Sequence, residues 1–72
     1  MDEKPQWSEE AKELTRKFVR NEMPAAMKSI YGRFALMGFL GGKVVLFDRR
    51  ESGRKDYYDN VEELLGDGWV VD

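Results

Sequence analysis

The sequence predicts an α+β fold, with an N-terminal helix, a three-stranded antiparallel meander, a short helix and a short C-terminal strand. Three observations predict it. Apolar residues recur at helical spacing after Ser8, two turn signals separate three strand-like segments, and a second helix-capping pattern precedes Val61. With 72 residues the chain has room for one domain, which we expect to span residues 1–72 with a disordered lead over residues 1–7.

Ser8 is a preferred N-cap residue, and two glutamates follow it in the first turn, where negative charge favours the helix dipole. The apolar stripe of this helix consists of Ala11, Leu14, Phe18 and Val19. Pro24 kinks or breaks the helix. Because proline suits the first turn of a helix, we expect residues 25–31 to form a second helical segment that ends at Gly32. A single kinked helix and two separate helices both remain open.

Residues 34–47 form an apolar run, FALMGFLGGKVVLF, with Lys43 as its only charged residue. The central glycine pair tolerates the positive φ angles of a type I′ turn, so the run predicts a β-hairpin. The predicted cross-strand pairs are Leu40–Lys43, Met37–Leu46 and Leu36–Phe47. A helix over residues 34–40 is the alternative, because Ala, Leu and Met favour helices, but Gly38 and the lack of a polar face count against it.

Alternation along this hairpin places apolar side chains on both faces of the sheet. One face carries Phe34, Leu36, Leu40, Val45 and Phe47. The other carries Ala35, Met37, Phe39, Val44 and Leu46.

A second hairpin is predicted around Ser52-Gly53, since this register pairs opposite charges and two aromatic rings. Its predicted pairs are Glu51–Arg54, Arg49–Asp56 and Phe47–Tyr58. A capping box then begins a short helix, formed either by Asp59 with Glu62 or by Asn60 with Glu63. Residues 69–71 predict a short closing strand.

The composition argues against most enzyme classes. Cys and His are both absent, which excludes thiol chemistry, disulfides, zinc sites built on these residues, and the usual general base near pH 7. We therefore expect no enzymatic activity, no metal and no cofactor. The polar N-terminus does not have the pattern of a signal peptide, and the longest apolar run is shorter than the ~20 residues of a membrane span. We expect a cytoplasmic protein without a membrane partner.

Two apolar faces in so short a chain predict that part of the sheet remains uncovered and contacts protein. The candidate contact residues are Met37, Phe39, Leu40 and Val44. The expected partner is another protein or a second copy of the chain, as in a homodimer. This size is typical of inhibitors or adaptors of the kind that mobile elements encode. In the alternative interpretation, the two helices cover both faces and leave a monomer.

A cluster of cations surrounds the second predicted turn and suggests a nucleic-acid or acidic partner. It consists of Arg49, Arg50, Arg54 and Lys55, within seven residues of sequence. Three acidic residues, Asp48, Glu51 and Asp56, are interleaved with it, so ordinary solvated turn charges are the alternative.

The stretch from Lys43 to Leu65 resembles three-stranded DNA-binding domains of the plant ethylene-response-factor or integrase arm-binding type. In those domains a strand, a basic turn and a strand precede an aromatic-Asp-x-x-Glu-Glu opening of a helix, here residues 58–63. The resemblance implies a sheet that binds DNA. It departs in the first strand, which is apolar where such sheets present Arg and Trp to the major groove.

Overall fold

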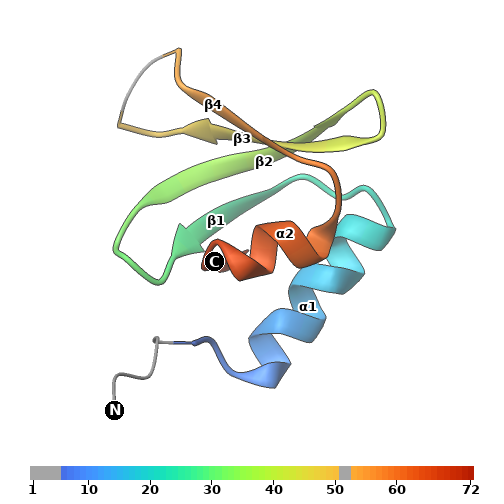
Figure 1. Ribbon diagram of the computed structural model, residues 1–72, viewed down its shortest axis with the longest axis vertical. Helices are drawn as coiled ribbons and strands as arrows, with labels where there is room; N and C mark the ends of the chain where they lie inside the picture. Colours follow the sequence, from blue (N-terminus) through green and yellow to red (C-terminus); the bar gives the residue numbers. More distant parts are fainter. Residues whose placement is uncertain (1–5, 51–52) are drawn as a thin grey trace.

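The computed structural model describes residues 6–50 and 53–72 of the chain. It confirms the α+β class (Figure 1). In chain order the elements are α1 (Glu9–Arg20), β1 (Ala25–Ser29), β2 (Phe34–Leu40), β3 (Lys43–Asp48), β4 (Lys55–Tyr58), α2 (Val61–Gly66) and β5 (Trp69–Val71).

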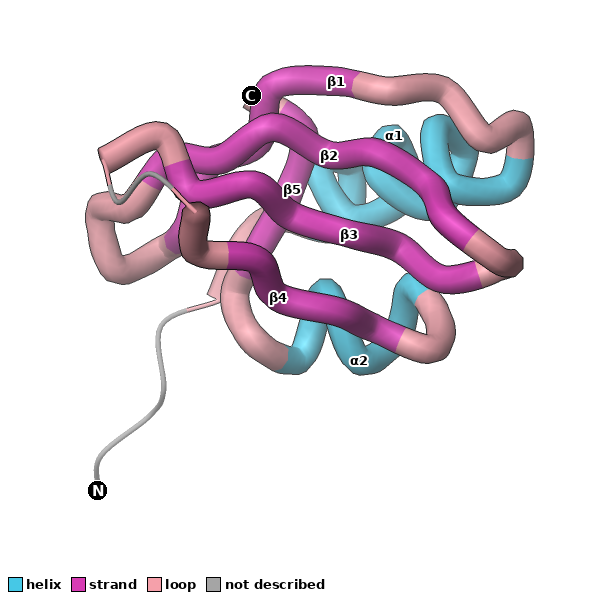
Figure 2. The backbone as a smooth tube through the Cα atoms, turned by 90° about the horizontal axis from the view of Figure 1, so that it is seen from above, coloured by secondary structure: helices cyan, strands magenta, loops and turns pink. Residues whose placement is uncertain are grey.

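The five strands form one antiparallel sheet in the order β4-β3-β2-β1-β5. Both helices lie on the same side of this sheet (Figures 1 and 2). The α2 helix belongs to the connection that carries the chain from β4, at one edge, to β5, at the other. The sheet therefore has an inner face under the helices and an outer face without them. Within the described ranges, no helix has the length and apolar character needed to cross a membrane.

The first helix begins as predicted, because the Ser8 hydroxyl accepts a hydrogen bond from the backbone N–H of Ala11. Its buried side differs from the predicted stripe. Thr15 is fully buried, whereas Leu14 is 46% exposed. The Thr15 hydroxyl donates to the Ala11 carbonyl (2.8 Å) and accepts from the N–H of Val71 (3.0 Å). These two bonds satisfy a polar side chain inside the protein and attach the helix to the edge of β5.

Residues 25–31, predicted to be helical, instead contain strand β1 and the turn that follows it. The strand pairs on both sides, with Met27 opposite Ala35 of β2 and opposite Val71 of β5. Ladder hydrogen bonds and the burial of Met27 outweigh the modest helix propensity of this segment. Tyr31, in the turn after β1, is 68% exposed.

The β2–β3 hairpin has the predicted register, and residues 34–40 form a strand as expected. All three predicted pairs are present: Leu40–Lys43, Met37–Leu46 and Leu36–Phe47. Gly41 and Gly42 have φ angles of 58° and 80°, the left-handed values that such a tight turn requires.

The predicted register of the second hairpin is wrong by three residues. Phe47 pairs with Lys55 rather than with Tyr58, and Asp56 lies opposite Leu46 rather than opposite Arg49. The connection is longer than the predicted two-residue turn, because β3 ends at Asp48 and β4 begins only at Lys55. At its start the Asp48 carboxylate accepts hydrogen bonds from the N–H of Arg50 (2.8 Å) and from the Arg33 guanidinium (2.7 Å). The predicted pair Glu51–Arg54 lies partly outside the described residues.

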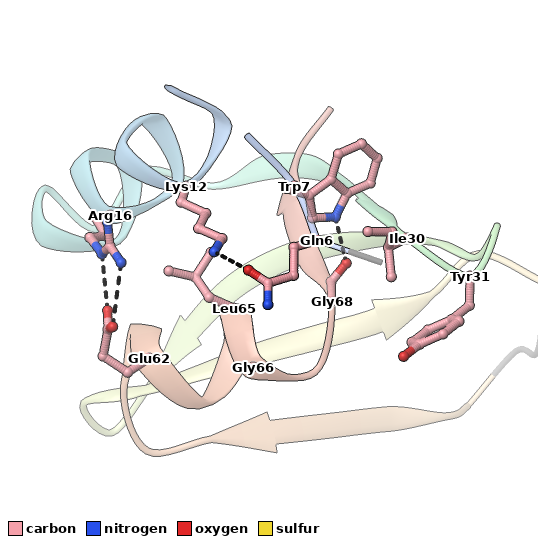
Figure 3. A pocket seen from close by; sticks show the side chains of 10 residues that line it. All are labelled: Gln6, Trp7, Lys12, Arg16, Ile30, Tyr31, Glu62, Leu65, Gly66 and Gly68. Atoms are coloured by element: carbon pink, nitrogen blue, oxygen red, sulfur yellow. Dashed lines mark hydrogen bonds and ion pairs between the residues drawn. The ribbon is translucent and has the colours of Figure 1, made fainter. Parts of the chain in front are cut away.

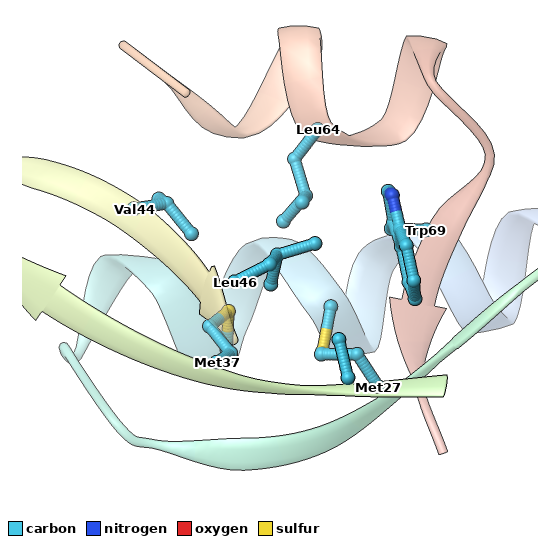
Figure 4. Close-up of a cluster of buried hydrophobic side chains, with 7 residues drawn as sticks. Met27, Met37, Val44, Leu46, Leu64 and Trp69 are labelled. Carbon is cyan, nitrogen blue, oxygen red and sulfur yellow. The ribbon is translucent and has the colours of Figure 1, made fainter. Parts of the chain in front are cut away.

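The hydrophobic core lies between the inner face and the two helices (Figure 4). Its buried members are Met27, Ala35, Met37, Val44, Leu46, Leu64 and Trp69. Helix α2 is capped by Asn60, whose side chain accepts from the N–H of Glu63 (2.9 Å), while the Glu63 carboxylate accepts from the N–H of Asp59 (3.2 Å). This cap positions Leu64 over the sheet.

Candidate protein-binding face and a neighbouring pocket

Most of the predicted contact residues lie on the covered face of the sheet. Met37 and Val44 are core residues with 2% and 3% of their surface exposed. Phe39 packs against the same core. Leu40, which alternation and register place on the opposite face, is 66% exposed. The structure therefore corrects the predicted surface: α1 and α2 cover the Met37 and Val44 side of the hairpin and leave the other side bare.

The outer face carries a group of exposed apolar side chains, which we call the outer patch. Its members are Phe34, Leu36, Leu40, Phe47 and Tyr57, from β2, β3 and β4, and each is between 43% and 66% exposed. At about 100 Å² each, the five side chains leave on the order of 500 Å² in water. A patch of this size on a small soluble protein commonly marks a binding surface.

A glycine of β2, Gly38, lies within the outer patch and is covered by a ring of that patch. Gly38 is opposite Val45, and a Cβ atom at Gly38 would lie only 3.3 Å from the Phe47 ring. The ring therefore occupies the space above the glycine. Val45, at an outward position of β3, is 1% exposed because its neighbours surround it. The outer patch is thus a packed surface of rings and branched side chains.

Lysines are the only charged residues at outward positions of the five strands, namely Lys28, Lys43 and Lys55. Two have carboxylate partners: Lys43 Nζ lies 3.1 Å from an Asp59 oxygen, and Lys28 Nζ lies 3.8 Å from an Asp72 oxygen. Lys55 Nζ instead lies 5.7 Å from the centre of the Phe47 ring, a cation–π contact.

Two members of the predicted basic cluster, Arg54 and Lys55, are directed to opposite faces of the sheet. Arg49, Arg50, Arg54 and Lys55 are all exposed. Arg54 Nε lies 3.8 Å from a carboxylate oxygen of Asp56, and Asp56 occupies an inward position of β4. Lys55, in contrast, extends over the outer patch. An ion-pair network also joins Arg33 to Asp48 and Asp56. Sequence reasoning missed this network because the predicted β2–β3 pairs ended at Leu36–Phe47 and Asp56 was placed opposite Arg49.

A pocket of about 290 Å³ lies between α1, α2 and the turn after β1 (Figure 3). Its lining residues are Gln6, Trp7, Lys12, Arg16, Ile30, Tyr31, Glu62, Leu65, Gly66 and Gly68. Residues 1–7 were predicted to be a disordered lead, but the Trp7 indole N–H donates to the Gly68 carbonyl (2.8 Å) and closes one side of the pocket. Residues 1–5 lie outside the described part of the chain.

Shifted pKa values occur at two places in the described part of the chain, the Arg16–Glu62 pair and Tyr58. Hydrogen bonding between Arg16 and Glu62 (3.0 Å) raises the pKa of Arg16 and lowers that of Glu62, as expected for an ion pair. Burial raises the pKa of Tyr58, and its hydrogen bond to the Asp67 carboxylate (2.5 Å) adds to the effect. Tyr58 is half-buried and packs against the core, so its protonated hydroxyl serves as a structural donor.

In the part of the chain that the structure describes, acidic residues do not gather in threes in a way that could hold a metal ion. Comparison with known proteins gives no matching family, no matching curated protein and no matching solved structure.

Proposed function

We propose that this chain is a small, non-enzymatic, cytoplasmic module that binds protein through the outer patch, and that the partner is a second copy of the same chain. The supporting observation is the exposure of five large apolar side chains on one sheet face. Burying this surface would release water from it at a gain of roughly 25 cal/mol per Å².

The size of the outer patch suits a weak symmetric dimer. A two-fold contact between two such patches would bury on the order of 1,000 Å² in total, which is close to the lower limit of specific interfaces. Lys28 and Lys43 would not prevent the contact, because each has a carboxylate beside it. We therefore expect a dissociation constant of about 10 µM to 1 mM.

The experiment is a measurement of solution mass by sedimentation equilibrium over that concentration range. We expect the wild-type mass to rise towards the dimer, and Leu36→Glu to keep the chain monomeric. Leu14→Glu is the matched control, since Leu14 is exposed to a similar extent but lies on α1. A wild type that stays monomeric at about 1 mM, or two variants that behave alike, would contradict the proposed dimer.

A second candidate function is binding to single-stranded nucleic acid. It is favoured by the combination on one sheet face of three exposed rings, Phe34, Phe47 and Tyr57, with lysines beside them. Bases stack on such rings while cations contact the phosphates. The leucines in the outer patch, which offer no stacking surface, favour the protein partner instead.

Fluorescence anisotropy with labelled single-stranded DNA and RNA, at two salt concentrations, separates the two candidates. Salt-sensitive binding that is lost in Phe47→Ala and weakened in the double variant Arg49→Gln and Arg50→Gln would support the nucleic-acid function. Absence of binding at low salt would eliminate it.

A further inference from the structure

The pocket of Figure 3 is a separate site from the outer patch, and we propose that it binds small aromatic carboxylates. The pocket is partly open to solvent, and its lining combines apolar side chains with cationic groups. Four large side chains, Trp7, Ile30, Tyr31 and Leu65, supply the walls, and Lys12 lies on the adjoining side of the lining.

Trp7 is held in place rather than free at the chain end. Its indole N–H donates to the Gly68 carbonyl, and Lys28 Nζ lies 5.1 Å from the ring centre. A fixed indole wall needs no reordering when a ligand arrives, which lowers the entropic cost of binding. Gly68 contributes by its conformation: its φ is 90°, and a Cβ there would lie 2.8 Å from the Ile30 side chain.

Lys12 is the pocket cation with the weaker carboxylate partners, since its attraction to Glu62 acts without a hydrogen bond. Its side chain is only 20% exposed, yet its hydrogen bond goes to the neutral amide oxygen of Gln6 (3.2 Å). The carboxylate of Glu9 lies 3.7 Å away and is itself largely in solvent. A ligand carboxylate would give this partly buried cation a charged hydrogen-bond partner, which is stronger than an amide.

The other cation of the pocket is already neutralised. Arg16 forms ion pairs with both Glu13 and Glu62, so it contributes little net positive charge to a ligand. Glu62 in turn would repel a second anionic group near Arg16. The pocket therefore suits one carboxylate near Lys12 rather than a phosphate or a dicarboxylate.

The size of the pocket limits the body of the ligand. Its volume of about 290 Å³ is close to the lower end of ligand pockets, which run from ~300 to ~1,000 Å³. One ring or a fused pair of rings with a short acidic arm fits this volume. Indole-3-acetate is a suitable probe, with indole as its neutral analogue and tryptamine as its cationic analogue.

The experiment is a titration followed by the ¹H–¹⁵N spectrum of the full chain. Indole-3-acetate should shift the indole N–H signal of Trp7 and the amide signals of Gly66 and Gly68. The indole signal of buried Trp69 should stay in place and serves as an internal control. Indole should bind more weakly, and tryptamine more weakly still, because Lys12 repels its amine.

Lys12→Gln should weaken indole-3-acetate binding by roughly tenfold, the effect of losing one charged hydrogen bond. Lys17→Gln is the matched control: it removes the same charge from the same helix outside the pocket, and it should change nothing. The proposal is overturned if the Trp7 signal does not move at about 10 mM ligand, if tryptamine binds equally well, or if Lys12→Gln retains the affinity. None of these outcomes depends on the outer patch.

Discussion

The inner and outer faces of the sheet carry similar side chains in different surroundings. Leu36 and Met37 are neighbours in β2, yet Leu36 is 50% exposed and Met37 is 2% exposed. The inner face is covered by α1 and α2, whereas only neighbouring side chains shield the outer one. The comparison shows that hydrophobicity in a strand does not by itself identify core positions: the placement of the helices decides which apolar face becomes core.

The largest difference between the faces should appear when each receives a charge. Met37→Asp places an unpaired carboxylate in the core, so we expect the chain to unfold. Leu36→Asp places the same carboxylate in water, and we expect a folded protein with a thermal midpoint within a few degrees of wild type. Circular dichroism during heating measures both. Two variants of equal stability would show that the faces are not distinguished as described.

Removing an aromatic side chain from each face should give a smaller difference in stability between the two faces. Trp69→Ala removes a ring that is 2% exposed from the inner face, and we expect it to cost about 3–5 kcal/mol of unfolding free energy. Phe34→Ala removes a half-exposed ring from the outer face, where a loss of about 1 kcal/mol is expected. Urea denaturation followed by circular dichroism gives both values. An equal loss would mean that the outer rings contribute to the stability of the monomer.

Substitutions at the contact between α1 and β5 should show how much that contact stabilises the helix on the inner face. Thr15→Val keeps the shape of the side chain but leaves the N–H of Val71 without its acceptor, at an expected cost of about 1–3 kcal/mol. Thr15→Ser keeps the hydroxyl and should lose less. Urea denaturation should rank the two variants in that order. A Thr15→Val protein as stable as Thr15→Ser would show that packing alone attaches the helix.

The smallest effect concerns the two adjacent tyrosines of β4. The pKa of Tyr58 is raised in the folded state, so its contribution to stability is complete below about pH 10, the unfolded value, and declines as the pH rises above it. Tyr58→Phe should reduce this alkaline loss. Tyr57→Phe, on the outer face, should leave it unchanged. Thermal midpoints between pH 7 and pH 11 measure the difference, and an identical pH profile for both variants would contradict the assignment.

The predictable parts of the fold were those encoded locally. Ser8 and the Asn60–Glu63 cap, the Gly41-Gly42 turn and the alternation of the hairpin depend on residues close in sequence. The order of helix, hairpin and closing strand followed from these signals.

The errors arose where distant residues decide the structure. Residues 25–29 become a strand because β2 and β5 pair with them on both sides, and no local pattern marks that pairing. Met37 and Val44 were predicted to lie on an exposed face. Alternation shows which residues share a face of the hairpin, but it does not show which of the two faces the helices cover. The pocket was missed for the same reason, since Trp7, Lys12 and Leu65 meet only in three dimensions.

The position of β1 between β2 and β5 has a consequence for the order in which the chain folds. The β2–β3 and β3–β4 pairings join residues close in sequence, whereas β1 meets β5 through partners such as Met27 and Val71, which are far apart in the sequence. Closing so long a loop is slow compared with forming a hairpin. The meander should therefore form before the transition state is crossed, and the β1–β5 contact after it. Rate measurements would then find that Val71→Ala accelerates unfolding, while substitutions around Gly41 slow folding.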